Sequence, residues 1–463
     1  MNGYQLLEQI GSVVWGPLTM GLTLGIGGYL TIRSRGFQFR RFGTVLRRTI
    51  GSVSPPPKGT DGTTPFRALG AGPGATRGPG NIVGVAAAVT AGGPGAVVWM
   101  WLAALVGMMT KFAEVSLAVR ERRRGAGPMG YLKSIPGVGG GLAALFALTC
   151  AAAALGMGNM TQSNSVSEAL GGSFGVPAFL TAGAIGVLTL WGTSRGIGGV
   201  MRLSAVVVPV ITIAYTAASI AAIWQGRALL PDAFGMMFGQ AFGVQAAAGG
   251  ALGYTVRSAM RFGVARGLFS NEAGLGSAPI AHAEAETNSP VEQGMWGIFE
   301  VFVDTILSCT LTALVLLTAG DGTLWQNGET GAKLAAICFS AALGESWGRW
   351  VSVFIALFGL TSIFGWCAYG EKAAAFLLRK NADSVGWFRV LYAAGAAAGA
   401  VFTAEGVWLL SDVLAGCMML VNLTGLLLLA PCALDLIADY ERWERRSRLR
   451  SRPGGDRIGT GRA

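Results

Sequence analysis

The chain has 463 residues, of which 52% are hydrophobic and only 13% are charged. A water-soluble protein of this length needs more charge to cover its surface, so the composition indicates that lipid surrounds much of the chain. The formal net charge is +11, but the basic residues stand in short clusters between apolar segments. That distribution is typical of a protein in a lipid bilayer and argues against nucleic acid as a partner. The six cysteines and the single histidine show no metal-binding spacing, so we expect no cofactor.

A helix that spans a bilayer needs about 20 mostly apolar residues. By this measure the chain predicts an all-α polytopic membrane protein with about eleven spans. They lie near residues 11–31, 66–90, 95–119, 139–163, 177–194, 203–224, 237–262, 293–319, 349–378, 387–402 and 406–436. The connection at 263–292 is glycine-rich and too long for a simple turn. A shorter apolar stretch near 332–343 is expected to lie flat at one surface.

Clusters of Lys and Arg follow every odd-numbered predicted span. They occupy residues 33–48, 120–133, 195–202, 257–266, 372–380 and 442–452. The other connections carry almost no cations beyond Arg227 and Lys333. Because basic loops stay in the cytoplasm, we expect a multi-pass protein of the plasma (inner) membrane, with the N-terminus outside and the C-terminus in the cytoplasm.

Two of the predicted spans are poor helices. The second span contains Pro79 and several glycines, interrupted by Arg77 and Asn81, and the seventh contains a similar glycine run from Gly239 to Gly253. Backbone of this kind is tolerated in a membrane only where it is buried in protein or lines a cavity. The alternative is that the glycines merely permit close helix packing.

The two broken spans begin two successive blocks of five spans, and an odd number of spans inverts the second block relative to the first. Paired breaks in inverted halves indicate a transporter site near the middle of the bilayer. The predicted division is an extra N-terminal helix with a basic loop (1–65), a first repeat (66–225), a second repeat (226–438) and a basic tail (439–463). At such breaks, half-helix N-termini suit a carboxylate, and free carbonyl oxygens suit an ammonium group or a small cation.

Several segments in chain order resemble one known family. They are Gly78-Pro79-Gly80-Asn81-Ile82, Trp99 to Glu114, Gly158-Asn159-Met160 with Gln162, Arg266 to Pro279 with His282, Asp304-Thr305, and Thr361-Ser362 with Gly365-Trp366. They resemble the alanine or glycine:cation symporter family. The resemblance implies the leucine-transporter-type fold, with an inverted repeat of five plus five helices and one extra N-terminal helix.

The resemblance also implies roles for individual residues. Gly78, Gly80 and Asn81 are expected to line the substrate site, with Gln162 and Trp366 as wall residues, and Phe242 and Gly243 contribute from the second break. Thr361 and Ser362 resemble the hydroxyl pair that, with carbonyl groups of the second span, holds a sodium ion in this fold. The alternative is that both hydroxyls bond back to their own helix. The loop with Arg266, Phe269, Asn271 and Glu272 resembles a gate, in which Arg266 is the expected partner of Glu272.

The chain departs from the family pattern at Pro79, where Thr is usual, and at Arg77, where an apolar residue is usual. Arg77 is expected to bind the substrate carboxylate, or to replace the coupling cation and make transport independent of sodium. The alternative is that Arg77 reaches to water and does neither.

Three ionisable residues lie within predicted spans. Lys111 and Glu114 are three positions apart on one helix and are expected to pair with each other. Asp304 has no cation at helical spacing, so it is a candidate for binding the coupling cation or carrying a proton. Its structural alternative is a carboxylate that holds two helices together.

These features predict a secondary transporter that carries small neutral amino acids such as alanine or glycine, driven by sodium. A proton-coupled or ion-independent carrier, or a non-transporting amino-acid sensor on the same fold, stays an alternative. A channel is less favoured because eleven spans in inverted halves indicate alternating access. The sequence contains no nucleophile–base arrangement and no phosphate-binding loop, so we do not expect an enzyme.

Overall fold

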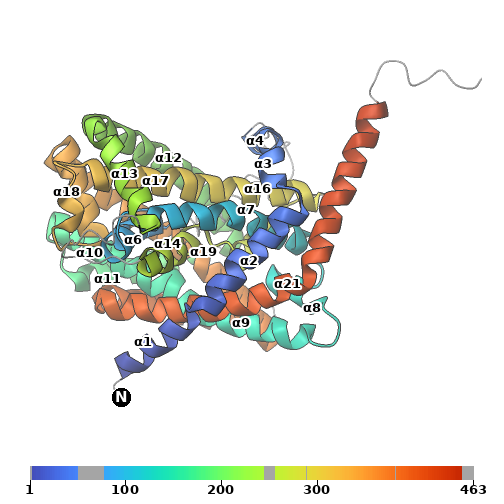
Figure 1. The fold of residues 1–463 in the computed structure, drawn as a ribbon. Helices are drawn as coiled ribbons and strands as arrows, with labels where there is room; N and C mark the ends of the chain where they lie inside the picture. The colour runs from blue at the N-terminus through green and yellow to red at the C-terminus, as the bar shows by residue number, and fades with distance from the viewer. Residues whose placement is uncertain are drawn as a thin grey trace, which may run out of the picture.

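The structure is a computed structural model that describes residues 3–50, 78–194, 196–243, 256–287, 289–380 and 382–450. These residues form helices joined by short connections, and no strand occurs among them. Figure 1 shows the helices packed into a single bundle, with the C-terminal part of the last helix projecting from one end. The all-helical prediction is therefore confirmed for the described part of the chain.

The first part of the chain forms helices that lie against the later ones. Its bounds are α1 Gly3–Val14, α2 Pro17–Arg33, α3 Phe37–Arg40, α4 Phe42–Thr49, α6 Val83–Gly92, α7 Ala96–Arg120, α8 Pro128–Lys133, α9 Gly139–Leu155, α10 Thr161–Phe174, α11 Ala178–Thr193 and α12 Gly196–Gln225. The predicted first span at 11–31 is divided into α1 and α2, because Pro17 starts a new helix at its first turn. A π-helical turn, Gly156–Met160, joins α9 to α10.

The second part begins with two helices separated by residues outside the described set. Its bounds are α13 Leu230–Ala241, α14 Val256–Asn271, α15 Ala278–His282, α16 Pro290–Val301, α17 Thr310–Thr318, α18 Gly331–Leu343, α19 Glu345–Leu378, α20 Trp387–Val401 and α21 Ala404–Arg450. A π-helical segment, Phe302–Cys309, joins α16 to α17. Helix α18 coincides with the apolar stretch predicted near 332–343.

Seven helical segments among the described residues are long and apolar enough to cross a membrane. They are Tyr4–Arg33, Ala96–Arg120, Gly139–Phe174, Gly198–Gln225, Pro290–Thr318, Glu345–Leu378 and Ala404–Ser447. Shorter apolar helices occupy Val83–Gly92, Ala178–Thr193, Gly331–Leu343 and Trp387–Val401. Three of these fall within predicted spans, so the count of eleven spans and the inverted repeat stay predictions.

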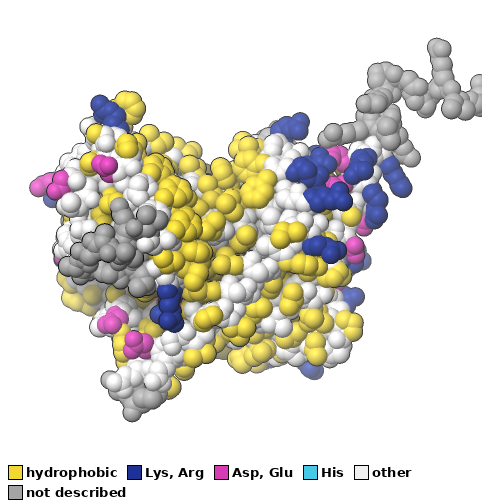
Figure 2. Space-filling model, viewed as in Figure 1, with side chains coloured by type: hydrophobic (Ala, Val, Ile, Leu, Met, Phe, Trp, Pro, Cys, Tyr) yellow, Lys and Arg dark blue, Asp and Glu magenta, His cyan; other side chains and the backbone are white. Residues whose placement is uncertain are grey.

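The surface separates by residue type. Figure 2 shows hydrophobic side chains over the middle of the molecule and Lys and Arg side chains gathered at the end where α4 and the last part of α21 lie. Two ion pairs connect the end of α3 and the residue after it to α21: Arg40 Nη2 lies 2.8 Å from Glu441 Oε1, and Arg41 Nη2 lies 2.9 Å from Glu444 Oε2. The basic loop after the first span and the C-terminal tail therefore lie on the same side, as the charge pattern requires.

One basic cluster of the charge pattern lies elsewhere. Arg266 pairs with Asp412, near the start of α21, while Glu441 lies near its other end. Arg257 and Arg261 line a cavity beside Trp15, at the end of α1. The prediction that these arginines belong to the cytoplasmic loop is wrong. The physical reason is that α14 is a continuous helix from Val256 to Asn271 that contains all three arginines and packs against α6 and α7.

Candidate functional site

The predicted break in the second span is present in its described part. Gly78 has an extended backbone, Pro79–Asn81 form a single 3-10 turn, and the regular helix begins only at Val83. Residues 78–82 are all buried. Backbone that departs from helical hydrogen bonding inside a membrane protein needs protein or ligand partners, so the groups packed around this turn define the candidate site.

Three helices close on the break so tightly that two positions require glycine. A Cβ atom built on Gly78 would lie 2.8 Å from Ser362 Oγ and 3.0 Å from Gln162 Oε1. A Cβ atom on Gly80 would lie 3.1 Å from the Phe269 ring. Both glycines therefore permit a close approach that another residue would obstruct. Of the predicted residues, the structure brings Gln162 of α10, Phe269 of α14 and Ser362 of α19 to this turn.

Asn81 is held by contacts on three sides. Ser270 Oγ donates to Asn81 Oδ1 at 2.5 Å, and Asn81 Nδ2 donates to Asp304 Oδ1 at 3.5 Å. Thr312 Oγ1 donates to the main-chain oxygen of Asn81 at 2.8 Å. Because these contacts occupy the Asn81 side chain, the main chain at Gly78–Gly80 offers the freer surface to a ligand.

Asp304 joins the candidate site from a distorted segment. It is fully buried within the π-helical segment Phe302–Cys309. Such π-turns widen a helix locally and recur at functional sites. Gln162 comes two residues after the other π-turn, Gly156–Met160. Two of the helices that deliver polar groups to the break are therefore distorted at or near the position where they do so.

Sequence reasoning missed Ser270 and Thr312 as partners of Asn81. Ser270 lies in the motif that resembles the family, between Phe269 and Asn271, for which the resemblance implies a role in the gate. Thr312 lies eight positions after Asp304, about two helical turns along, so its hydroxyl could have been placed near the same face.

Thr361 and Ser362 have different surroundings. Thr361 Oγ1 donates to its own helix, at 2.9 Å from Phe358 O and 3.2 Å from Leu357 O. A hydroxyl that donates in this way still presents its lone pairs, so the oxygen can accept or bind a cation. Ser362 is fully buried and faces Gly78. The hydroxyl groups of Thr361 and Ser362 thus stay a predicted sodium site, and the Thr361 hydroxyl also donates to main-chain oxygens of its own helix.

Trp366, Phe242 and Gly243 have other contacts. Trp366 packs against Gly158 and its Nε1 donates to Glu272 Oε1 at 3.1 Å. Phe242 is 57% exposed and lies 6.2 Å, between ring centroids, from Trp99. Gly243 has a positive φ of 81° at the end of the described segment. Residues 244–255, with most of the predicted second break, and Arg77 lie outside the described residues.

Arg266 forms a buried ion pair that the sequence did not indicate. Its Nη1 and Nη2 each lie 2.8 Å from an oxygen of Asp412. Its Cζ lies 4.5 Å from the ring centroid of Trp408. Trp408 in turn stacks on Phe269, with ring centroids 5.1 Å apart. Because Phe269 touches Gly80, this group covers one side of the break.

The expected pairing of Arg266 with Glu272 is therefore wrong. Six positions separate the two residues, which places them about 240° apart around a helix, on different faces. Glu272 instead accepts hydrogen bonds from Ser277 Oγ and Trp366 Nε1. Asn271, next to it, donates through Nδ2 to Thr305 Oγ1 at 2.9 Å.

The expected pairing of Lys111 with Glu114 is also wrong. Lys111 Nζ donates to the main-chain oxygen of Asn271 at 2.9 Å and lies 3.7 Å from Glu300 Oε2. Glu114 accepts from Asn422 Nδ2 of α21 at 2.5 Å. The reason is that α16 packs along α7, side by side in Figure 1, and presents its own carboxylate to Lys111.

Comparison with known proteins places this geometry in a family. The profile of the sodium:alanine symporter family matches residues 2–452. The chain belongs to the sodium:alanine symporter family. This confirms the resemblance, and the family is one of membrane transporters.

Named relatives of the family match nearly the full length. The chain is 36% identical to the sodium/alanine symporter AgcS of Methanococcus maripaludis, covering 93% of this chain and 95% of that one. It is 39% identical to an uncharacterized transporter of Haemophilus influenzae (94% and 95%) and 32% identical to the probable sodium/glutamine symporter GlnT of Bacillus subtilis (95% and 91%). Among solved structures, a mutant manganese transporter of Eremococcus coleocola matches with a TM-score of 0.50 at 14% identity, covering 83% of this chain and 81% of that one. This last similarity concerns the fold alone.

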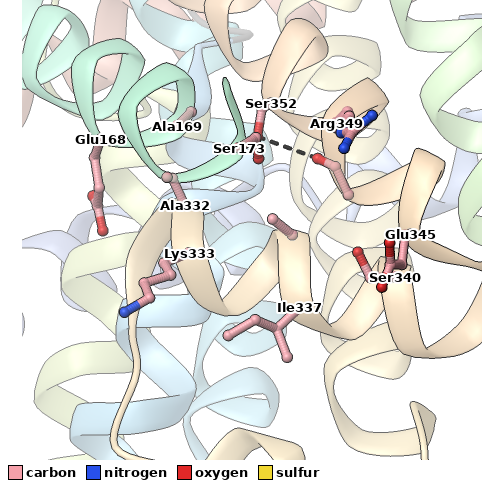
Figure 3. Close-up of a pocket in the computed structure, with 13 residues that line it drawn as sticks. Glu168, Ala169, Ser173, Ala332, Lys333, Ile337, Ser340, Glu345, Arg349 and Ser352 are labelled. Atoms are coloured by element: carbon pink, nitrogen blue, oxygen red, sulfur yellow. Dashed lines mark hydrogen bonds between the residues drawn. The ribbon is translucent and has the colours of Figure 1, made fainter. Parts of the chain in front are cut away.

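This member of the sodium:alanine symporter family also carries a polar cavity away from the break. Its volume is about 380 Å³, between α10, α18 and α19. Figure 3 shows Glu168, Lys333, Glu345 and Arg349 around it, with Ser173 and Ser352 joined by a hydrogen bond of 2.7 Å. The lining carries both signs of charge, but none of the residues predicted for the substrate site.

Proposed function

We propose that this chain is a sodium-driven symporter of small neutral amino acids such as alanine or glycine. The observation that carries the proposal is the buried break in the α-helix at Gly78–Asn81, packed against Gln162 and Ser362. The names of relatives support it, since one is a sodium/alanine symporter and another a probable sodium/glutamine symporter. The proposed setting is the inner membrane, with the N-terminus outside and the C-terminus in the cytoplasm.

The turn suits a zwitterion of small size. The helix α6 begins at Val83, so its first N–H groups have no partner within the helix and favour a carboxylate. Carbonyl oxygens of the turn suit the ammonium group. The Phe269 ring lies close to Gly80, which leaves little room for a long side chain and favours alanine or glycine.

The coupling cation is proposed to bind between the turn and α19. Ser362 Oγ approaches Gly78, and Thr361 presents oxygen lone pairs beside it. Neutral hydroxyl and carbonyl oxygens are hard ligands, which suit a monovalent cation such as sodium. Asp304, linked to the turn through Asn81, is the proposed second coupling group, for a cation or for a proton.

The proposed gate is the group Arg266, Asp412, Trp408 and Phe269, which we name the aromatic gate. Its ion pair is largely buried, with Arg266 only 7% exposed. The gate joins α14 to α21 over Gly80. Movement of α14 relative to α21 would then open one side of the site.

The decisive experiment is uptake of radiolabelled alanine and glycine into proteoliposomes with an imposed sodium or proton gradient. We expect saturable uptake driven by an inward sodium gradient, and counterflow when unlabelled substrate is loaded inside. Uptake with a proton gradient alone would favour the proton-coupled alternative. A purified protein that binds alanine without transporting it would favour the sensor and exclude the symporter.

A substitution of Arg77 tests whether sodium coupling applies to this chain. Removal of the guanidinium in Arg77→Ala tests the two hypotheses stated for it. Loss of affinity for alanine indicates that Arg77 binds the carboxylate. Uptake that becomes dependent on sodium indicates that the guanidinium replaces the cation. If uptake and ion dependence are both unchanged, neither role holds.

A further inference from the structure

A buried cluster of ionisable side chains lies beside the candidate site, where α7, the segment Asn271–His282 and α16 meet. Lys111 Nζ lies 3.7 Å from Glu300 Oε2, and His282 Nε2 lies 2.9 Å from Glu300 Oε1. Each of these side chains is at most 1% exposed. The cluster connects to the candidate site, because Lys111 holds the main-chain oxygen of Asn271, the residue after Ser270.

His282 joins the cluster through both ring nitrogens. Gln293 Nε2 lies 2.8 Å from His282 Nδ1, and Nε2 of the ring lies 2.9 Å from Glu300 Oε1. Lys111 and His282 are the basic side chains of the cluster formed by Lys111, Glu114, Glu272, Glu300 and His282, all of them described residues.

Two further carboxyl groups face the same lysine. Lys111 acts electrostatically on both Glu114 and Glu272, and both are at most 1% exposed. Their hydrogen-bond donors are uncharged: Asn422 and the main chain of Gly274 and Gly276 for Glu114, and Ser277 and Trp366 for Glu272. These neutral donors add no positive charge to the cluster.

The charges of the cluster do not balance without a bound proton. With all three carboxyl groups ionised and the imidazole neutral, one ammonium group would leave two negative charges among buried side chains. The titratable groups that face the cluster from α8, α19 and α9 are Tyr131, Tyr369 and Cys150, and phenol and thiol groups supply no positive charge. An uncompensated buried carboxylate is costly and is relieved by protonation.

The segment Asn271–His282 connects this cluster to α19 and α21. Glu272 has a left-handed backbone with φ of 55°, which costs about 1 kcal/mol in a residue other than glycine and persists only where contacts hold it. Trp366 of α19 and Asn422 of α21 supply those contacts to Glu272 and Glu114. Opening this junction would separate the carboxyl groups from their donors and admit water.

We infer that the cluster of Lys111, Glu114, Glu272, Glu300 and His282 is a proton-binding site. It holds at least one proton while the segment Asn271–His282 is packed as described, and releases it when the segment opens. Closure of this junction is therefore favoured by acid and opposed by alkali. The inference goes beyond the proposed function. Of the two tests that follow, only the transport assay depends on that function.

The first test is alanine counterflow in proteoliposomes with equal pH inside and outside, so that no proton gradient contributes. One proton makes a linked equilibrium change by up to about tenfold per pH unit. We expect wild-type exchange to fall at least about fivefold from about pH 6.5 to about pH 8.5. Glu114→Gln imitates the protonated carboxyl group, so its exchange should stay nearly constant over this range.

The matched control is Glu121→Gln, the same substitution at the end of α7, where Glu121 pairs with Arg124 at the surface. Its exchange should follow the wild-type curve. The inference is overturned if Glu114→Gln transports and keeps the wild-type decline, or if wild-type exchange does not depend on pH. Glu272→Gln takes the place of Glu114→Gln if the latter is not recovered as folded protein.

The second test is the melting temperature of the purified full-length protein against pH, which does not require alanine to be the substrate. In the unfolded chain the carboxyl groups are ionised above about pH 5, whereas the folded cluster keeps a proton. The folded state then binds more protons, so stability must fall as pH rises. We expect this fall in wild type and Glu121→Gln, and a flatter curve in Glu114→Gln.

If neither Gln variant folds, the wild-type curve decides: a melting temperature that is constant or rises with pH overturns the inference, and a falling one supports it. An inactive wild type with a falling curve would contradict the proposed function but not the proton site.

Discussion

Gly80 illustrates how one residue sets the shape of the candidate site. It packs so closely against Phe269 that a methyl group would lie 3.1 Å from the ring. The neighbouring Asn81 uses its side chain to hold Ser270 and Asp304. The glycines of the turn therefore leave the main chain uncovered by side chains, and the side chain of Asn81 holds the turn in place.

Substitution of Gly80 by Ala tests this close packing. We expect the Michaelis constant for alanine to rise at least about tenfold, equivalent to about 1.4 kcal/mol, because the new methyl group displaces Phe269 toward the substrate. The matched control is Gly84→Ala, since a Cβ atom there meets no atom within 4 Å. Equal uptake kinetics in the two variants would contradict a substrate position at this turn.

Ser362 tests the sodium site at the same scale. Ser362→Ala removes one oxygen ligand, so we expect the sodium concentration for half-maximal uptake to rise about tenfold or more, with maximal uptake less affected. Ser352→Ala is the control, because Ser352 is buried on the same helix but bonds to Ser173. An unchanged sodium dependence in Ser362→Ala would remove this hydroxyl from the site.

At the scale of the helix, α14 contributes residues to two separate contact regions. Arg266 meets Asp412 on one face, while the helix end at Asn271 receives Lys111 and begins the segment that holds Glu272. A movement of α14 must therefore disturb both the aromatic gate and the buried cluster. The proposed opening of the site would therefore affect both regions.

Asp412→Asn tests the aromatic gate. The substitution leaves the largely buried guanidinium of Arg266 without its counter-charge, which costs about 3 kcal/mol or more in a buried pair. We expect faster release of bound alanine and weaker uptake, because the covered state is destabilised. Asp412→Glu, which keeps the charge, should recover part of the activity. If Asp412→Asn retains wild-type release and uptake, the ion pair is structural only.

At the scale of the molecule, charge separates the two ends. Basic side chains gather near α4 and the end of α21 (Figure 2), and the ion pairs of Arg40 and Arg41 join the end of α3 and the residue after it to α21. Hydrophobic side chains cover the middle of the same face. The arrangement fits a bilayer between the two ends, and the proposed orientation places the basic end in the cytoplasm.

Labelling of single added cysteines in intact cells tests this orientation. We expect a membrane-impermeant maleimide to label Glu329→Cys, beside α18, and to leave Arg446→Cys on α21 unlabelled until the cells are opened. Arg446 is exposed, and Glu329 is partly exposed. Unmodified protein measures the background from the six native cysteines, which are buried or partly buried. The reverse labelling pattern would invert the proposed topology.

The composition and apolar periodicity of the sequence alone determined that this is a helical membrane protein, and its ordered motifs determined the family. These signals are local: about 20 apolar residues span a bilayer whatever surrounds them, and glycine with proline interrupts a helix at Gly78–Asn81 on its own account. The partners of the buried charged side chains, in contrast, did not follow from neighbouring residues in the sequence. Arg266 and Lys111 each had a carboxylate nearby in sequence, yet each pairs with one from another helix. Only the packing of α14 against α21 and of α16 against α7 decided those partners, because a buried charge is stabilised by whichever carboxylate the fold brings to its own face of the helix.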